Sequence, residues 1–128
     1  MAPTWLSQAA VLAMHERLLA EHGGAAGIRD SGLLDSALAR PKQLHAYSEP
    51  DTCDMAAAYA AGIIRHHPFV DGNKRTGFMS AYLFLALNGL RTTATEVDVV
   101  RVVTLLAANG IDESAFADWL RDNSEVAA

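Results

Sequence analysis

The sequence contains only one cysteine, Cys53, so no disulfide can form within the chain. A lone cysteine is typical of proteins from a reducing compartment. Cys53 lies in an alanine-rich stretch, where we expect it to serve as a small buried apolar residue. No apolar run reaches the ~18 residues of a membrane span, and the first residues, MAPTWLSQ, lack the pattern of a signal peptide. We therefore expect a cytoplasmic protein without membrane association.

The chain also lacks an excess of positive charge, since 15 acidic and 10 basic residues give a net charge of −5. Binding to nucleic acid or to an anionic membrane needs a basic surface, so we expect neither. The local sign differs between positions 65 and 75. There three basic residues, Arg65, Lys74 and Arg75, accompany one acidic residue, Asp71. This stretch can attract an anion on an otherwise acidic protein.

Proline is scarce, with four residues, and repeats and low-complexity tracts are absent. A chain of 128 residues is long enough for one domain with its own core, so we expect a single domain spanning residues 1–128. Apolar residues at helical spacing, together with capping residues, predict an all-α fold of about six helices. The expected helices cover about residues 7–22, 30–39, 51–66, 73–87, 95–108 and a last one that begins after Asp112.

Two segments are harder to assign. The stretch PKQLHAYSEP, bounded by Pro41 and Pro50, breaks the helical pattern, and we expect a short loop or hairpin at 41–50. Five valines between 97 and 103 favour a strand by propensity. The spacing of Val99, Val103 and Leu106 is helical, however, and Thr95 can cap a helix that starts there. We therefore predict a helix over residues 95–108.

Residues 66–77, HHPFVDGNKRTG, gather most of the polar chemistry of the chain. Pro68 disfavours helical geometry at the residue before it, so one helix should end near His67. The next should begin after the VDG turn, with Asn73, Lys74 and Arg75 in its first turn. Unpaired N–H groups at a helix start attract anions. Basic side chains oppose the helix dipole there, and a bound phosphate would reverse that cost.

His67 and Asp71 lie four residues apart on either side of this turn. An imidazole with a pKa near ~6.5 can accept a proton at neutral pH. The carboxylate can orient that ring or bind Mg²⁺, which prefers carboxylate and phosphate oxygens. A base, a metal carboxylate and a phosphate clamp are the parts of phosphoryl or nucleotidyl transfer to a hydroxyl.

Each of these residues also has an ordinary structural interpretation when it is taken alone. His67 can cap a helix, Asp71 can form a turn, and the two basic residues can simply face solvent. Phe69 is expected to be an apolar anchor of the loop, and His66 to lie on the surface at a helix end. The remaining histidines have no partner in the pattern and are interpreted as structural: His15, His22 and His45.

The segment HPFVDGNKR resembles the signatures of the Fic/Doc superfamily. Fic enzymes carry HPFx[DE]GNGR, and the shorter Doc toxins carry HxFx[DN]ANKR. Lys74, which replaces a glycine of the Fic signature, is the Doc feature, whereas Pro68 and Gly72 are Fic-like. The upstream stretch GGAAGIRDSGLLDSALARPKQ is similar to Doc proteins as well. The resemblance covers most of the chain and weakens after residue 95.

This resemblance implies a mechanism. In Fic adenylyltransferases the histidine deprotonates a target hydroxyl that attacks ATP, the acid binds Mg²⁺, and the turn cradles the phosphates. In Doc toxins the lysine fills part of the anion hole, and the γ-phosphate goes to a threonine of elongation factor Tu, which stops translation. By position, the resemblance implies the following roles: His67 as base, Asp71 as Mg²⁺ ligand, Gly72, Asn73, Lys74 and Arg75 at the phosphates, and Arg65 as a further phosphate or substrate contact.

The resemblance also implies partners. The segment 41–50 corresponds to the flap that holds a target segment, by strand addition. Self-inhibited Fic proteins carry [ST]xxxE[GN], and no glutamate of this chain precedes glycine or asparagine. We therefore expect an antitoxin that covers the site in trans with its own helix.

Three other functions remain open at this point. The first is transfer of AMP to the target hydroxyl, as in Fic enzymes. The second is a metal-dependent phosphohydrolase that uses His66, His67 and Asp71, although such sites normally need further ligands. The third is a binding module in which the motif holds a phosphate without catalysis.

Overall fold

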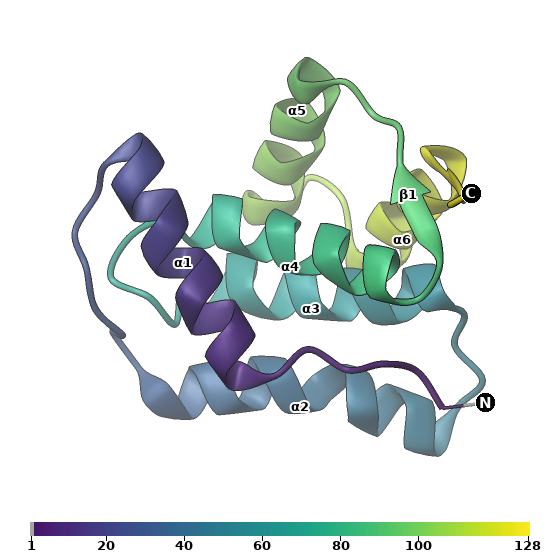
Figure 1. Ribbon diagram of the computed structural model, residues 1–128, viewed down its shortest axis with the longest axis horizontal. Coiled ribbons are helices and arrows are strands. Elements are labelled where there is room, and N and C mark those ends of the chain that lie inside the picture. The colour runs from purple at the N-terminus through teal and green to yellow at the C-terminus, as the bar shows by residue number, and fades with distance from the viewer. Residues whose placement is uncertain (1) are drawn as a thin grey trace.

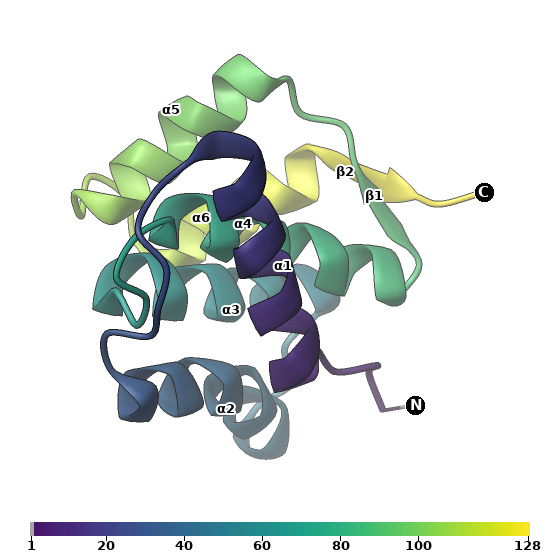
Figure 2. The same cartoon turned by 60° about the vertical axis from the view of Figure 1, so that its left-hand side comes forward.

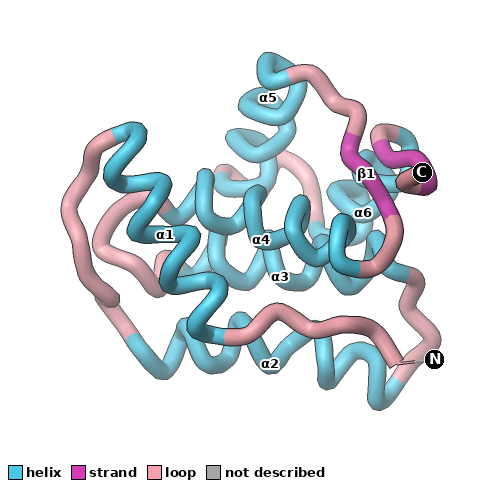
Figure 3. Tube along the Cα trace, viewed as in Figure 1, coloured by secondary structure: helices cyan, strands magenta, loops and turns pink. Residues whose placement is uncertain are grey.

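The computed structural model describes residues 2–128, and over this range the chain forms six α-helices and one two-stranded sheet (Figures 1 and 3). The helices and strands are α1 (Gln8–His22), α2 (Ser31–Tyr47), α3 (Thr52–His66), α4 (Asn73–Leu87), β1 (Leu90–Thr92), α5 (Glu96–Ala107), α6 (Glu113–Asp122) and β2 (Ser124–Val126). The predicted all-α fold with six helices is confirmed. Among the described residues, no helix is long and apolar enough to cross a membrane.

Helix α3 forms the centre of the domain. Eleven of its 15 residues are buried, and it contacts α2, α4, α5 and α6. Small residues allow this close packing. A Cβ placed on Gly62 would lie 3.0 Å from the Cβ of Ala37 on α2, and one on Gly77 of α4 would lie 2.5 Å from Cγ1 of Ile64. The core is thus built around a helix whose neighbours approach its backbone directly.

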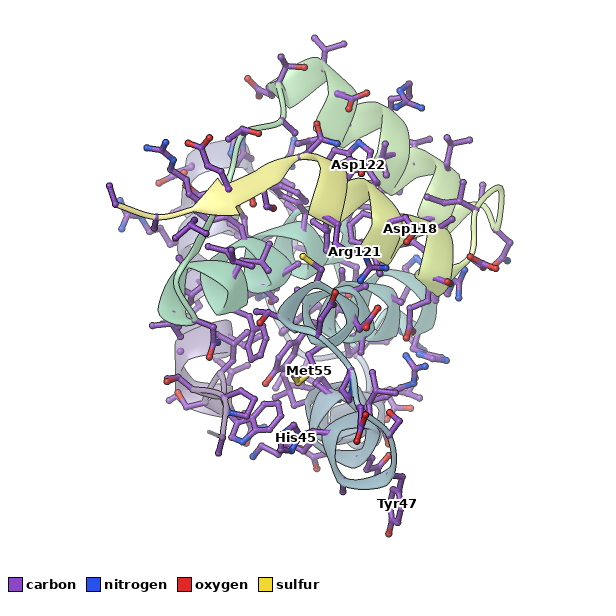
Figure 4. All side chains as sticks on the ribbon, turned by 90° about the vertical axis from the view of Figure 1, so that its right-hand side faces the viewer. His45, Tyr47, Met55, Asp118, Arg121 and Asp122 are labelled. Carbon is purple, nitrogen blue, oxygen red and sulfur yellow. The ribbon has the colours of Figure 1, made fainter. Side chains whose placement is uncertain are left out.

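Helix α2 does not stop at Pro41, and the predicted loop or hairpin flap at 41–50 is wrong. The helix continues to Tyr47, whose side chain projects away from its end (Figure 4). Proline within a helix removes one hydrogen bond, here to the carbonyl of Ala37. That cost is offset because Pro41 is buried and because His45 packs edge-on against Trp5, with ring centroids 5.6 Å apart. Tertiary packing therefore overrides the local signal.

The valine-rich segment is helical, as predicted, and forms α5. The side chain of Thr95 accepts a hydrogen bond from the N–H of Asp98. The Asp98 carboxylate accepts hydrogen bonds from Arg101 and from Nε1 of Trp119, and thereby ties α5 to α6. The valines fit a helix because one face of α5 packs against the core.

The small antiparallel sheet was not predicted. β1 follows α4 and pairs with β2 at the end of the chain, with Leu90 opposite Val126 and Thr92 opposite Ser124 (Figure 2). Strands of three residues are too short to show an alternating pattern in the sequence. The pairing brings the end of the chain back against the segment that follows α4.

An ion-pair cluster fixes α6 on the start of α3. Arg121 donates hydrogen bonds to Asp51 and Asp54, at 2.7 and 3.0 Å, and to Asp118 at 2.6 Å (Figure 4). Asp51 and Asp54 also form the capping box of α3. Between them lies Cys53, which is buried as expected, and burial raises the pKa of its thiol to about 11.

Candidate functional site

The connection from α3 to α4, residues 67–72, is called the motif corner here. α3 ends at His66, and His67 adopts the left-handed conformation, with φ 51° and ψ 58°. Gly72 has φ 77° and precedes α4, which starts at Asn73. The predicted end of one helix before Pro68 and the start of the next at Asn73 are both confirmed. The corner reverses the chain within six residues.

The motif corner is held by the connection between α1 and α2, which runs beside it (Figures 1 and 3). The N–H of Val70 donates to the carbonyl of Gly27 at 3.0 Å, and the N–H groups of Arg29 and Asp30 donate to the carbonyl of Pro68. Ile28 and Phe69 form an antiparallel bridge. A segment about forty positions upstream therefore shapes the motif corner.

His15 of α1 supports the corner from within. Its ring stacks on Phe69 with a centroid distance of 3.8 Å, and its Nε2 lies 2.8 Å from the carbonyl oxygen of Asp71. Because a carbonyl can only accept, Nε2 carries the proton and donates it. Both residues are buried, His15 at 4% exposure and Phe69 at 0%. His15 was expected to be structural, because no spacing in the chain connects it to the motif.

His67 presents its imidazole to solvent at the edge of a cavity. Its Nδ1 lies 3.2 Å from the carbonyl oxygen of Arg65. Since this oxygen accepts, Nδ1 carries the proton and Nε2 holds the lone pair. The ring is thus oriented by the end of its own helix, not by Asp71. A neutral imidazole in this tautomer can take a proton at Nε2.

The Asp71 carboxylate accepts backbone hydrogen bonds on both oxygens, from Gly72 at 2.9 Å and from Ala25 at 3.2 Å. A Cβ on Gly24 would lie 2.9 Å from Oδ2, so the upstream connection closes around this group. Each oxygen keeps a further lone pair. No group of three His, Cys, Asp or Glu side chains able to hold a metal occurs among residues 2–128. A single carboxylate fits Mg²⁺, which binds proteins through few carboxylates and completes its shell with phosphate oxygens and water.

The first turn of α4 supplies the positive end of the site. The Asn73 side chain is bonded twice to the backbone of Phe69, from Phe69 N–H and to Phe69 O, both at 3.0 Å. These two hydrogen bonds close the loop through the Asn73 side chain. The backbone N–H of Asn73 lies at the helix start and can bind a ligand. Lys74 and Arg75 are exposed and line the cavity. Neither forms an ion pair with a carboxylate of the described chain.

The cavity has a volume of about 800 Å³ and joins this polar end to an apolar wall. Lys74, Phe78 and Tyr82 line it at a spacing of four residues, so they share one face of α4. Facing them, α5 contributes Val99, Val100 and Val103. Cavities of this kind, apolar with a few polar groups at one end, are typical of small-molecule sites. A ligand with a phosphate end and a ring matches this distribution.

The structure does not bring all the predicted residues together. His67, Asp71, Gly72, Asn73, Lys74 and Arg75 line the cavity, together with His22. Arg65 is not among the lining residues, and its Nη2 donates to the carbonyl of Ile111 at 3.0 Å. His66 turns its Nδ1 toward the carbonyl of Gly62. Arg65 thus contacts the connection between α5 and α6, and His66 makes no contact with the cavity.

The chain is similar in sequence to one protein family and to two known relatives. A sequence profile of the Fic/DOC family matches residues 5–85. The Toxin Doc of Mycolicibacterium smegmatis is 43% identical over 88 residues, which cover 66% of this chain and 65% of that protein. The Protein kinase doc of Escherichia phage P1 is 34% identical over 118 residues, which cover 91% of this chain and 92% of that protein. The profile match includes α1 to α3, the motif corner and most of α4.

Proposed function

The chain belongs to the Fic/DOC family, and on this premise we propose that it is a Doc-type toxin that transfers the γ-phosphate of ATP to a hydroxyl of a target protein. The observation that carries the proposal is that His67 and the positive start of α4 line one cavity. The names of the two relatives, Toxin Doc and Protein kinase doc, support it further.

In this reaction the hydroxyl oxygen of the target attacks the γ-phosphorus while its proton passes to Nε2 of His67. The bond between the γ-phosphorus and the bridging oxygen breaks, and ADP leaves. Lys74, Arg75 and the unpaired N–H groups of the first turn of α4 hold phosphate oxygens as negative charge shifts to the leaving group. Asp71 is the residue that would hold Mg²⁺, which neutralises phosphate charge when it is bound.

Two features bear on the choice between phosphate and AMP transfer. Lys74 lines the cavity and places an ammonium group where the Fic signature has glycine. By the Doc resemblance, this group occupies part of the anion site. This favours a terminal phosphate at His67. Gly72, which takes a left-handed conformation at φ 77°, matches the Fic signature and keeps AMP transfer as the second candidate.

We propose a threonine of elongation factor Tu as the target and an antitoxin helix as the regulator. The apolar wall of the cavity continues onto an exposed part of α5, where Val97 is 82% and Val100 60% exposed. An amphipathic helix laid against this wall would bury those valines and block the cavity. Control in trans fits a chain without the self-inhibitory glutamate motif.

Mass spectrometry of elongation factor Tu after incubation with the protein, Mg²⁺ and ATP tests the proposal. A gain of one phosphate on a threonine is the expected result. An AMP adduct would replace the phosphotransferase by the second candidate, and an unmodified target would refute this choice of substrate.

Replacement of His67 by alanine should reduce transfer by about 10²- to 10⁴-fold, the usual contribution of a general base. His66→Ala is the matched control, because His66 lies next in the chain but does not line the cavity. Its activity should stay within twofold of the parent. Equal losses in both variants would contradict the assignment and favour a site that uses both histidines.

A further inference from the structure

Arg29, in the connection between α1 and α2, makes an unusual set of contacts at the motif corner. Its Nε donates to the carbonyl of His67 at 2.6 Å, and its Nη2 donates to the carbonyl of His66 at 2.7 Å. Its backbone N–H donates to the carbonyl of Pro68 at 2.7 Å. One residue therefore binds three consecutive carbonyls around His67.

The carbonyl of His66 needs a partner because it belongs to the last turn of α3, and the carbonyl of His67 follows it at the cap. The last carbonyls of a helix have no N–H within the helix, and a cation at that end also interacts favourably with the helix dipole. His67, moreover, is not glycine, and its left-handed conformation with φ 51° costs free energy unless the surroundings enforce it. Proline at position 68 restricts it further. The guanidinium of Arg29 supplies the contacts that enforce it.

The backbone of His67 determines where its ring points. Nδ1 reaches the carbonyl of Arg65 at 3.2 Å, and this hydrogen bond selects the tautomer with the lone pair on Nε2. A rotation of the His67 backbone toward an ordinary conformation would break it and turn Nε2 away from the cavity. We propose that Arg29 is a positioning residue that holds His67 in its left-handed conformation and so keeps Nε2 directed at the substrate hydroxyl. The proposal rests on the proposed function only for the role of His67 as base.

Arginine suits this task better than lysine. Its planar fork presents two N–H groups in fixed directions, which match two adjacent carbonyls, whereas an ammonium group is a compact and strongly hydrated charge. No carboxylate of residues 2–128 forms an ion pair with Arg29. Its side chain is thus committed to the motif corner.

The test compares Arg29→Lys and Arg29→Met with the parent protein. Arg17→Met is the control, because Arg17 lies on α1, pairs only with Glu21 on the surface and does not line the cavity. Three quantities are measured: kcat, KM for ATP, and the ¹⁵N chemical shifts of the His67 ring, which report the tautomer. The NMR measurement needs no substrate. It therefore tests whether Arg29 positions His67 even if elongation factor Tu is not the substrate.

We expect kcat to fall by about 10- to 100-fold in both Arg29 variants, as for a catalytic group displaced by about 1 Å. KM for ATP should stay within twofold, and the His67 signals should shift toward the tautomer with the proton on Nε2. Arg17→Met should change none of these. An unchanged kcat and tautomer would overturn the proposal even if the variants melt at a lower temperature, and a rise confined to KM would overturn it as well.

Discussion

Two corners of this molecule have nearly the same length and different supports. The motif corner, residues 67–72, joins α3 to α4, and the distal corner, residues 108–112, joins α5 to α6. Each contains a left-handed residue other than glycine: His67, with φ 51°, and Asn109, with φ 59°. Asparagine adopts this conformation readily, whereas histidine does so less often.

The distal corner is held largely by its own neighbours, with one remote hydrogen bond from Arg65 of α3 to the carbonyl of Ile111. The N–H of Gly110 donates to Leu105 at 2.7 Å, the N–H of Asn109 to Leu106 at 3.2 Å, and Asp112 caps α6 through Ala115. The motif corner depends on remote groups: the ring of His15, the side chain of Arg29 and the backbone of Gly27. The difference teaches that a connecting corner can be specified locally, whereas the candidate site is shaped by a second segment of the chain.

Of four further substitutions that test this difference, the largest effect should come from closing the space that the second segment leaves for Asp71. A methyl group on Gly24 would lie 2.9 Å from the carboxylate, at a φ of 121° that disfavours side chains. We expect Gly24→Ala to reduce transfer by on the order of tenfold or more through displacement of Asp71. Gly23→Ala is the matched control, since Gly23 also has a positive φ and its methyl group would meet nothing within 4 Å. Equal activities in the two variants would show that Asp71 tolerates the contact.

The next effect should come from His15→Phe. The ring can still stack on Phe69, but the part-buried hydrogen bond to the carbonyl of Asp71 is lost, which costs about 0.5–1.5 kcal/mol. Urea denaturation should show that loss, and single-turnover rates should fall several-fold. His45→Phe, in which the ring contact with Trp5 lies away from the motif corner, should leave the rates unchanged. A stable His15→Phe variant with full activity would mean that this histidine is dispensable.

Arg65 connects the two corners, because it lies on α3 and donates to Ile111 in the distal corner. Arg65→Met should lower the free energy of unfolding by about 1–2 kcal/mol through the lost hydrogen bond. KM for ATP should remain within twofold, since the guanidinium does not reach the cavity. Steady-state kinetics provide the check. A tenfold rise in KM would restore the role at the phosphates that the family resemblance implied.

The smallest effect should follow Asn109→Gly. Glycine adopts positive φ without steric cost, and the hydrogen bonds of Asn109 and Gly110 come from the backbone. The free energy of unfolding should change by less than about 0.5 kcal/mol, the usual range for surface substitutions. Thermal melts and transfer rates measured together would expose a larger role for this corner.

The helices were predictable because their signals are local. Caps at Asp51, Thr95 and Asp112 and the stop before Pro68 set boundaries that the structure reproduces. The predicted helix end at Pro41 was wrong, because burial of Pro41 against the core outweighs the lost hydrogen bond. The sheet was not predicted either, because strands of three residues are too short to show an alternating pattern of apolar and polar residues.

For the site, the motif identified the residues that line the cavity, since they follow one another around a single corner. It could not identify His15 or Arg29, which lie 56 positions before Asp71 and 38 positions before His67. Only folding brings these side chains to the motif corner. Arg65 shows the converse, because the family resemblance implied a contact with phosphate or substrate, whereas its side chain donates to a carbonyl of the distal corner.

Cys53 offers a way to follow the motions of α3. Its thiol is the only one in the chain, it is buried, and its pKa of about 11 keeps it protonated and unreactive at neutral pH. Alkylation of the native protein must therefore wait for a local opening that exposes the start of α3, and its rate measures how often that opening occurs. His67 caps the other end of the same helix, so the labelling rate would report the stability of the helix on which the candidate base is placed.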